Sequence, residues 1–327
     1  MDNTLQQLCD LQLENEEYVR NTKLMAGEEY VKIGALLCTS SGFRPDIEII
    51  KSCKDILKQK TKKFSDFHGS LGTLLSMKMS IAQSPGSYID GIVSIYNKII
   101  EGKIFSSYTY ILTAMIINDR CLAGDIDADA ITAKTFTAFK ELTKGNPFSD
   151  EWYIPYLALT VTEDRDLDSM IKEINDSYKV IKKDHRLPGE IAMSAGILLT
   201  SSPKPVEEKA ADFCNLYEAI KKHKCHTSTS KAMSIYTTYV DLNEDRDTLI
   251  NSIVEVNEYF KGKKGYGMLS GTDDLRKSLA ASLVLKYYMK SASDQSTSII
   301  SAIITEEVLY IAIAAYMLII APITFQS

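Results

Sequence analysis

Cysteine and histidine side chains gather at one place in the chain, where together they could bind a metal ion. His223, Cys225 and His226 lie within four residues of one another, and Cys214 precedes them by one predicted helix. Thiolate and imidazole are the ligands that zinc prefers. The group lacks the paired Cys-x-x-Cys spacing of a complete zinc site, so the sequence favours a solvated turn between helices, and no cofactor is expected.

Three aspartates at alternate positions resemble the opening of an EF-hand calcium loop. They are Asp125, Asp127 and Asp129. Such a loop also needs a glycine at the sharp turn and a closing glutamate, and the chain has Ala130 and Phe136 at those positions. The pattern therefore favours acids at the start of a helix.

Asp66, His68 and Ser70 place three catalytic residue types together, and a base near a hydroxyl group can activate it as a nucleophile. A catalytic triad, however, is defined by geometry in space and not by adjacency in sequence. We interpret this segment as a helix cap. No catalytic residue is assigned, and the sequence favours a protein that is not an enzyme.

Two further motifs lack the context that would give them a function. Ser228-x-x-Lys231 has the spacing of penicillin-recognising enzymes, but no Ser-Asp-Asn or Lys-Thr-Gly accompanies it. Gly265, Gly267 and Gly271 do not follow a predicted strand, so they do not indicate a phosphate loop. We interpret the glycines as a linker between two helices.

Charge at the predicted helix ends is the most widespread chemical feature. Acids gather where the first helices of predicted pairs begin: Asp46, Asp90, Asp129, Asp166, Glu207 and Asp247. Lysines gather where those helices end: Lys60, Lys62, Lys63, Lys98, Lys103, Lys140, Lys144, Lys182, Lys183, Lys221, Lys222, Lys224, Lys261, Lys263 and Lys264. In a stacked array these helices point the same way, which predicts a basic edge and an acidic edge.

The simpler interpretation of these charges is that they complement the helix dipoles and add solubility. The alternative is an anion-binding edge that takes an acidic protein or a membrane surface, since the starts of the second helices lie on the same edge. Its candidate residues are Lys62, Lys63, Lys103, Lys144, Lys182, Lys183, Lys221, Lys222, Lys263 and Lys264.

An internal repeat of about forty residues would position all of these side chains. Phe64-Ser65, Phe105-Ser106 and Phe148-Ser149 mark three turns, which are 41 and 43 residues apart. Later turns are predicted at Leu187-Pro188 and near Thr227-Ser228. The motif Glu-Asp-Arg-Asp also opens two helices 81 residues apart, at 163–166 and 244–247. The serines of the three turns are predicted to cap the helices that follow.

Apolar residues within the repeats recur at helical spacing, as in one stripe of Leu167, Met170, Ile171, Ile174, Tyr178 and Ile181. We predict an all-α fold of seven antiparallel helix pairs and a final helix, arranged as an α-solenoid or a closed α/α toroid. The expected organisation is an N-terminal pair at 1–45, tandem hairpins at 46–290, and an apolar helix at 291–327 packed on the array.

The final helix contains an uninterrupted apolar run of 14 residues, Val308–Ala321. A spanning helix needs about twenty residues, and a shorter run more often lies buried in protein. Membrane attachment through residues 299–321 is therefore possible but less favoured.

Composition restricts the partners and the compartment. A net charge of -6 argues against nucleic acid, whose phosphates require a basic surface. The six cysteines have irregular spacing, which is typical of buried thiols in a reducing compartment. The first twenty residues lack the pattern of a secretory signal, so we expect a cytoplasmic protein.

The hairpin pattern resembles that of a known family. A first helix ends in Tyr/Leu-x-x-(Ile/Leu)-Lys and is followed by Phe-Ser, by Leu-x-x-Leu-Leu and later by an apolar final helix. This pattern is similar, from about Glu28 to Ile320, to an uncharacterised bacterial family called domain of unknown function four thousand and three. In that family a basic residue often follows the first Phe-Ser, where this chain has Asp66. The resemblance implies the fold and no activity.

We expect a helical-repeat protein that binds or scaffolds a protein or peptide partner, because repeat arrays offer extended surfaces for recognition. One alternative is an enzyme or small-ligand binder with a site in a central helical cavity. The other alternative is a membrane-associated protein held by its C-terminal apolar helix.

Overall fold

The computed structural model describes residues 1–24, 27–42, 44–61, 67–101, 107–124, 127–144, 150–227, 232–266 and 273–292. In these ranges the chain forms thirteen α-helices and two 3-10 helices, and it forms no β-strand. The predicted all-α class is confirmed. The chain divides into two compact units, an N-terminal unit of Gln6–Thr132 and a C-terminal unit of Met1–Leu5 with Ala133–Ser327.

Helices of the N-terminal unit follow one another with short connections. They are α1 (Asn3–Thr22), α2 (Glu28–Ser41), α3 (Ile47–Lys60), α4 (Gly69–Ile81), α5 (Pro85–Ile100) and α6 (Tyr108–Leu122). Helix α7 (Ala128–Leu142) begins in this unit and ends in the next.

Helices of the C-terminal unit continue the same alternation. They are α8 (Tyr153–Thr160), α9 (Leu167–Asp184), α10 (Gly189–Leu198), η1 (Leu199–Ser201), α11 (Val206–Lys222), η2 (Ala232–Tyr239), α12 (Arg246–Lys261) and α13 (Asp273–Ala292). The second member of the sixth pair, η2, is a 3-10 helix.

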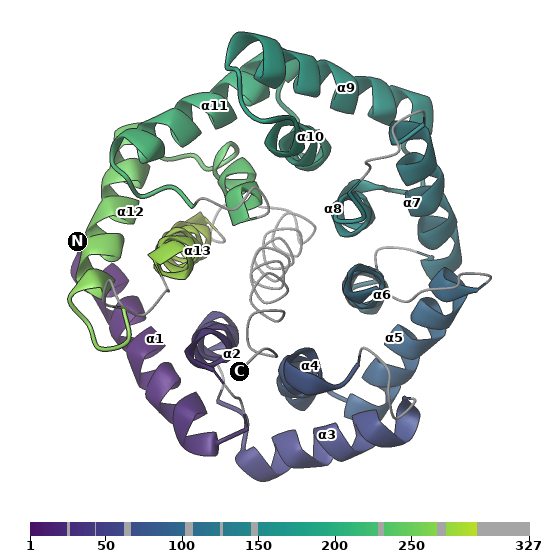
Figure 1. Ribbon diagram of the computed structural model, residues 1–327, viewed down its shortest axis with the longest axis vertical. Coiled ribbons are helices and arrows are strands. Elements are labelled where there is room, and N and C mark those ends of the chain that lie inside the picture. The colour runs from purple at the N-terminus through teal and green to yellow at the C-terminus, as the bar shows by residue number, and fades with distance from the viewer. Residues whose placement is uncertain are drawn as a thin grey trace, which may run out of the picture. The chain divides into compact units, whose positions relative to one another are not determined.

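Within each unit the helices form two layers (Figure 1). In the C-terminal unit, α9, α11 and α12 form the first layer, and α8, α10, η2 and α13 form the second. Successive first-layer helices contact each other, as do successive second-layer helices, in the order α8, α10, η2 and α13. The seven predicted helix pairs are present, and neighbouring pairs lie side by side within each unit.

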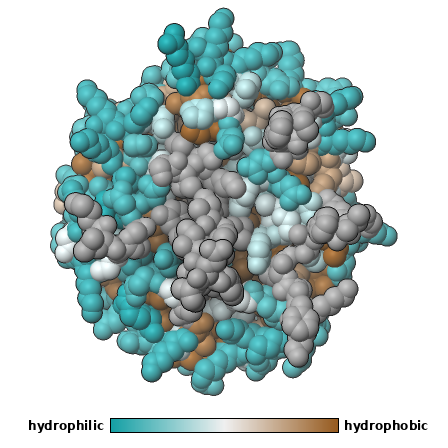
Figure 2. Space-filling view, viewed as in Figure 1, coloured by the Kyte–Doolittle hydropathy of each residue, from teal (hydrophilic) through white to brown (hydrophobic). Residues whose placement is uncertain are grey.

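The layers differ in how much of each helix is buried. Helix α9 buries one stripe, Met170, Ile174, Ser177 and Ile181, and exposes its charged face. Helix α8 instead buries every residue of 154–160. A helix that is apolar on all sides belongs in a protein core. Figure 2 shows the corresponding surface, with hydrophilic residues along α9 and α11.

Acidic and hydroxyl side chains begin several helices. Asp46 accepts a hydrogen bond from the Glu48 amide at the start of α3, and Asp166 accepts one from the Ser169 amide at the start of α9. Each satisfies a backbone donor that the helix leaves free, a contact that contributes about 1 kcal/mol.

Helices α4, α6 and α8 begin later than the turns where serine caps are predicted. Helix α4 begins after His68, helix α6 after Ser107 and helix α8 after Trp152. Ser107 caps α6 by accepting from the Thr109 amide. At α8, Asp150 accepts from the Trp152 amide at 3.0 Å and starts the turn. Ser65, Ser106 and Ser149 themselves lie outside the described residues.

Basic side chains in the C-terminal unit join the first member of a helix pair to the end of the second member of the same pair. Lys134 Nζ donates to the Thr162 carbonyl at 2.7 Å, Arg165 donates to the Thr200 carbonyl at 2.8 Å, and Lys204 Nζ donates to the Val240 carbonyl at 2.9 Å. Each carbonyl lies at or just after the end of a second-layer helix, where backbone acceptors lack helical partners. The cations satisfy these acceptors from the first helix of the same pair, or from the segment just before it.

No helix in the described part of the chain is long and apolar enough to cross a membrane. The apolar segment 299–321 lies outside the described residues. Its packing, and the predicted domain limits 1–45, 46–290 and 291–327, stay predictions.

Candidate docking groove

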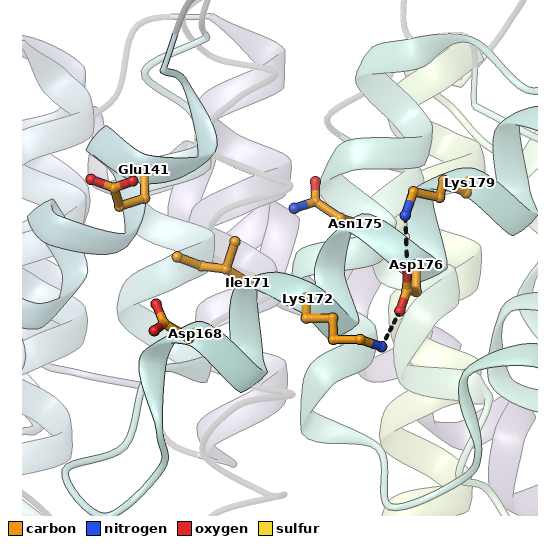
Figure 3. Close-up of a pocket in the computed structure, with 7 residues that line it drawn as sticks. All are labelled: Glu141, Asp168, Ile171, Lys172, Asn175, Asp176 and Lys179. Atoms are coloured by element: carbon orange, nitrogen blue, oxygen red, sulfur yellow. Dashed lines mark hydrogen bonds and ion pairs between the residues drawn. The ribbon is translucent and has the colours of Figure 1, made fainter.

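A groove of about 350 Å³ lies where the end of α7 meets the first half of α9 (Figure 3). Its lining residues are Glu141, Asp168, Ile171, Lys172, Asn175, Asp176 and Lys179. All of them lie in the C-terminal unit.

The lining residues from α9 lie on one continuous face of the helix. Each of positions 168, 171, 172, 175, 176 and 179 has another member of the set three or four residues away, the spacing of neighbours on a helix surface. The stripe that α9 buries runs next to this face, from Met170 to Ile181. Burial of that stripe therefore fixes which polar side chains line the groove.

One end of the groove is basic. Asp176 accepts hydrogen bonds from Lys172 at 2.8 Å and from Lys179 at 2.9 Å (Figure 3). These bonds lower the pKa of Asp176, and the bond to Asp176 raises the pKa of Lys172. One carboxylate serves two ammonium groups, so this end carries one positive charge in excess.

The other end is acidic. Figure 3 shows Glu141 and Asp168 on the same side of α9 as Ile171. Glu141 lies 3.6 Å from Lys144, a long contact between exposed side chains. The Asp168 carboxylate has no ion-pair or hydrogen-bond partner among the residues that the structure describes. Ile171, half-buried, provides an apolar surface between the two carboxylates.

The zinc candidates do not form a metal site in the described part of the chain, where no group of three or more metal-ligating side chains occurs. Cys225 is buried, and its sulfur accepts a hydrogen bond from Asn257. The ring of His226 packs edge-on against Tyr217 with centroids 6.2 Å apart. His223 ends α11 as its C-cap residue.

The side chain of His226 is half-buried, with lysines nearby. Its Nδ1 is buried and has no hydrogen-bond partner among the described residues. Burial, followed by the nearby Lys277 and Lys221, lowers the pKa of His226 below its usual value of 6.5. The ring is therefore neutral at physiological pH.

Asp127 and Asp129 of the calcium-like motif lie at the start of α7. Asp127 accepts hydrogen bonds from the amides of Asp129 and Ala130, both at 2.9 Å. The interpretation as acids at a helix start is confirmed for Asp127. Asp125 lies outside the described residues.

Of the three catalytic candidates, the structure describes the side chain of His68 alone. His68 Nε2 lies 3.3 Å from Thr61 Oγ1. Asp66 and the side chain of Ser70 lie outside what the structure describes, as do Ser228, Lys231, Gly267 and Gly271.

The separation of a basic edge from an acidic edge is wrong at two junctions in the N-terminal unit. Lys60, at the end of α3, pairs with Asp90 of α5 at 2.8 Å, and Lys98, near the end of α5, pairs with Asp129 of α7. The end of one first-layer helix lies against the beginning of the next, so basic ends and acidic starts meet there.

The remaining lysine candidates that the structure describes lie at or just after helix ends. Lys221 lies 3.6 Å from Glu218 on its own helix, and Lys263 lies over the Tyr259 ring at 4.2 Å. The rest divide into two groups. Lys144, Lys182, Lys183, Lys222 and Lys264 are described, and Lys62, Lys63 and Lys103 lie outside the described residues.

Three of the buried cysteines are unsuited to nucleophilic chemistry. All six are free, and five of them are buried. Burial raises the pKa of Cys9 and Cys214 to about 12 and that of Cys38 to about 11. A thiol must ionise to attack an electrophile. These three groups therefore stay protonated.

Comparison with curated proteins and with solved structures finds no match to the chain. The family model described as Protein of unknown function (DUF4003) matches residues 17–321. The match covers almost all of the helix pairs described above, and it confirms the resemblance predicted from the hairpin pattern. The chain belongs to the family described as Protein of unknown function (DUF4003).

Proposed function

We propose that the protein is a binding module that recognises a partner protein through the groove between α7 and α9. The observation that carries the proposal is the groove itself, where an unpaired carboxylate, a half-buried isoleucine and a bipolar charge pattern lie on one exposed helix face. Charged groups that are not neutralised by their own protein favour encounter with a complementary surface.

The two-layer construction supports a role in binding. The second layer is buried and supplies rigidity, whereas first-layer helices expose their charged faces. Repeated helix pairs offer extended surfaces of this kind to partner proteins. The buried, protonated thiols favour binding over nucleophilic catalysis, and free thiols agree with a reducing compartment such as the cytoplasm.

Site-specific photo-crosslinking in cells tests the proposal. A photo-reactive amino acid replaces Asn175 in the groove of the full chain. The matched control replaces Asn251, an exposed asparagine on α12 of the same unit. Both substitutions are on helix surfaces, and circular dichroism confirms that each variant is folded.

We expect a discrete protein to be crosslinked from position 175 and not from position 251. The signal should decrease when Asp168→Asn is added, because the partner then loses a charged contact. Identical products at both positions, or no product at position 175, would contradict the proposal.

A further inference from the structure

We infer that the acidic end of the groove binds an arginine side chain of the partner protein. The inference rests on the proposed function and specifies the chemistry of its partner. Three groups define the site: the carboxylates of Glu141 and Asp168 and the apolar side chain of Ile171 between them.

The charge balance along the groove favours a cation at this end. Glu141 and Asp168 bring two negative charges, and the only positive charge that contacts them among the described residues is Lys144, at 3.6 Å from Glu141. Its side chain is 77% exposed, so water screens this pair strongly. A cation from a partner would compete with an exposed contact and would also meet the unpaired Asp168.

Arginine fits this end better than lysine does. The two carboxylates come from different helices, and a guanidinium group presents five donors in a planar fork that can serve both. The amide of Asn175 lies on the same face and offers a further acceptor. The methylene stem of an arginine can lie on Ile171 while its charged head stays at the groove mouth.

The basic end of the groove limits how many cations the site accepts. Lys172 and Lys179 already share Asp176, so a second arginine on that side would face excess positive charge. We therefore expect the groove to bind a single arginine, at its acidic end. An acidic partner that uses the lysine-rich helix ends would show the opposite preference.

Fluorescence anisotropy with matched peptides tests the inference on the full chain. The probe is a labelled heptapeptide with one central arginine between leucines. Two analogues carry citrulline or glutamate in its place. Citrulline has nearly the shape of arginine but no charge, so comparing the arginine and citrulline peptides isolates the contribution of the charge to the binding affinity.

The arginine peptide should bind about tenfold more tightly than the citrulline peptide, because hydrogen bonds to charged groups exceed neutral ones by about 1.4 kcal/mol. The double variant Glu141→Gln, Asp168→Asn should remove this difference. Asp184→Asn, which neutralises an exposed acid at the end of the same helix outside the groove, should preserve it.

Equal affinity for arginine and citrulline peptides would overturn the inference, as would tighter binding of the glutamate peptide. Persistence of the arginine preference in the double variant would also overturn it. If crosslinking from position 175 still captures a partner in any of these cases, the proposed function stands and only the arginine specificity fails. If crosslinking captures nothing there, the proposed function itself fails.

Discussion

The buried contact between α9 and α11 gives a quantitative prediction about how neighbouring helix pairs are held together. Lys209 of α11 is only 1% exposed, and it pairs with Glu173 of α9. Its ammonium also donates to the Ser202 carbonyl at 3.0 Å. Arg165 contacts the same carboxylate from the other side. The substitution Glu173→Gln would leave the Lys209 charge buried with neutral acceptors only, the Ser202 carbonyl and the amide oxygen that replaces the carboxylate.

Removing one partner of a buried ion pair lowers the free energy of unfolding by about 3–5 kcal/mol. Because the Glu173 side chain is 22% exposed, water can partly replace its contacts, and we expect the lower end, about 3 kcal/mol. With a denaturant slope of about 3 kcal/mol per M, the urea midpoint should fall by about 1 M.

Urea unfolding followed by circular dichroism measures this effect. The control, Lys172→Gln, breaks an exposed pair on the same helix and should leave the midpoint unchanged. The double variant Glu173→Gln, Lys209→Met removes the buried charge as well, and it should recover about 1–2 kcal/mol. Equal midpoints for Glu173→Gln and the Lys172 control would refute the reasoning that a buried charge joins these helix pairs.

Three other predictions concern packing, thiols and pH. Gly72→Ala would place a Cβ 2.2 Å from the Phe67 carbonyl, so it should lower the free energy of unfolding by about 2 kcal/mol. Gly86→Ala has open space around the new Cβ, so in calorimetry it should raise the melting temperature. In the native protein a thiol reagent should react rapidly with Cys121 at most, and in denaturant it should react with all six cysteines. Rapid reaction of several thiols in the native protein would contradict their buried positions. Since the folded-state pKa of His226 lies below 6.5, the unfolded chain binds more protons, and the free energy of unfolding should fall as the pH decreases through 6.5. The urea midpoint of His226→Gln should lack this part of the pH dependence. Identical pH profiles for the variant and the unchanged protein would contradict the assignment.

Helix periodicity was sufficient to predict the elements, because burial of an apolar stripe is a local property of each helix. Met170, Ile174 and Ile181 belong to both the predicted and the observed stripe of α9. Asp127 could likewise be recognised as a helix start, since its partners are the amides two and three residues later. The family resemblance rests on the same local patterns.

Helix boundaries and charge segregation could not be predicted as well. The turn that starts α8 uses the Asp150 carboxylate, because several polar residues nearby can cap a helix and only the backbone path selects one. The contact between Lys60 and Asp90 depends on how successive first-layer helices meet, which sequence spacing does not contain.

The groove could not be predicted for the same reason. The spacing of Lys172, Asp176 and Lys179 predicts ion pairs along a helix, and these pairs are present. An unpaired Asp168 beside Glu141, however, arises only when the end of α7 lies against α9. The individual residues are ordinary surface charges, and their arrangement in three dimensions makes the candidate site.

Hydrogen–deuterium exchange of the full chain with and without the arginine peptide tests most directly whether this groove is the binding surface. Binding should slow exchange in fragments that cover the last turn of α7 and residues 167–179 of α9, and it should leave α12 unchanged. Slower exchange confined to other helices, or no change along α9 at saturating peptide, would contradict the assignment of the groove.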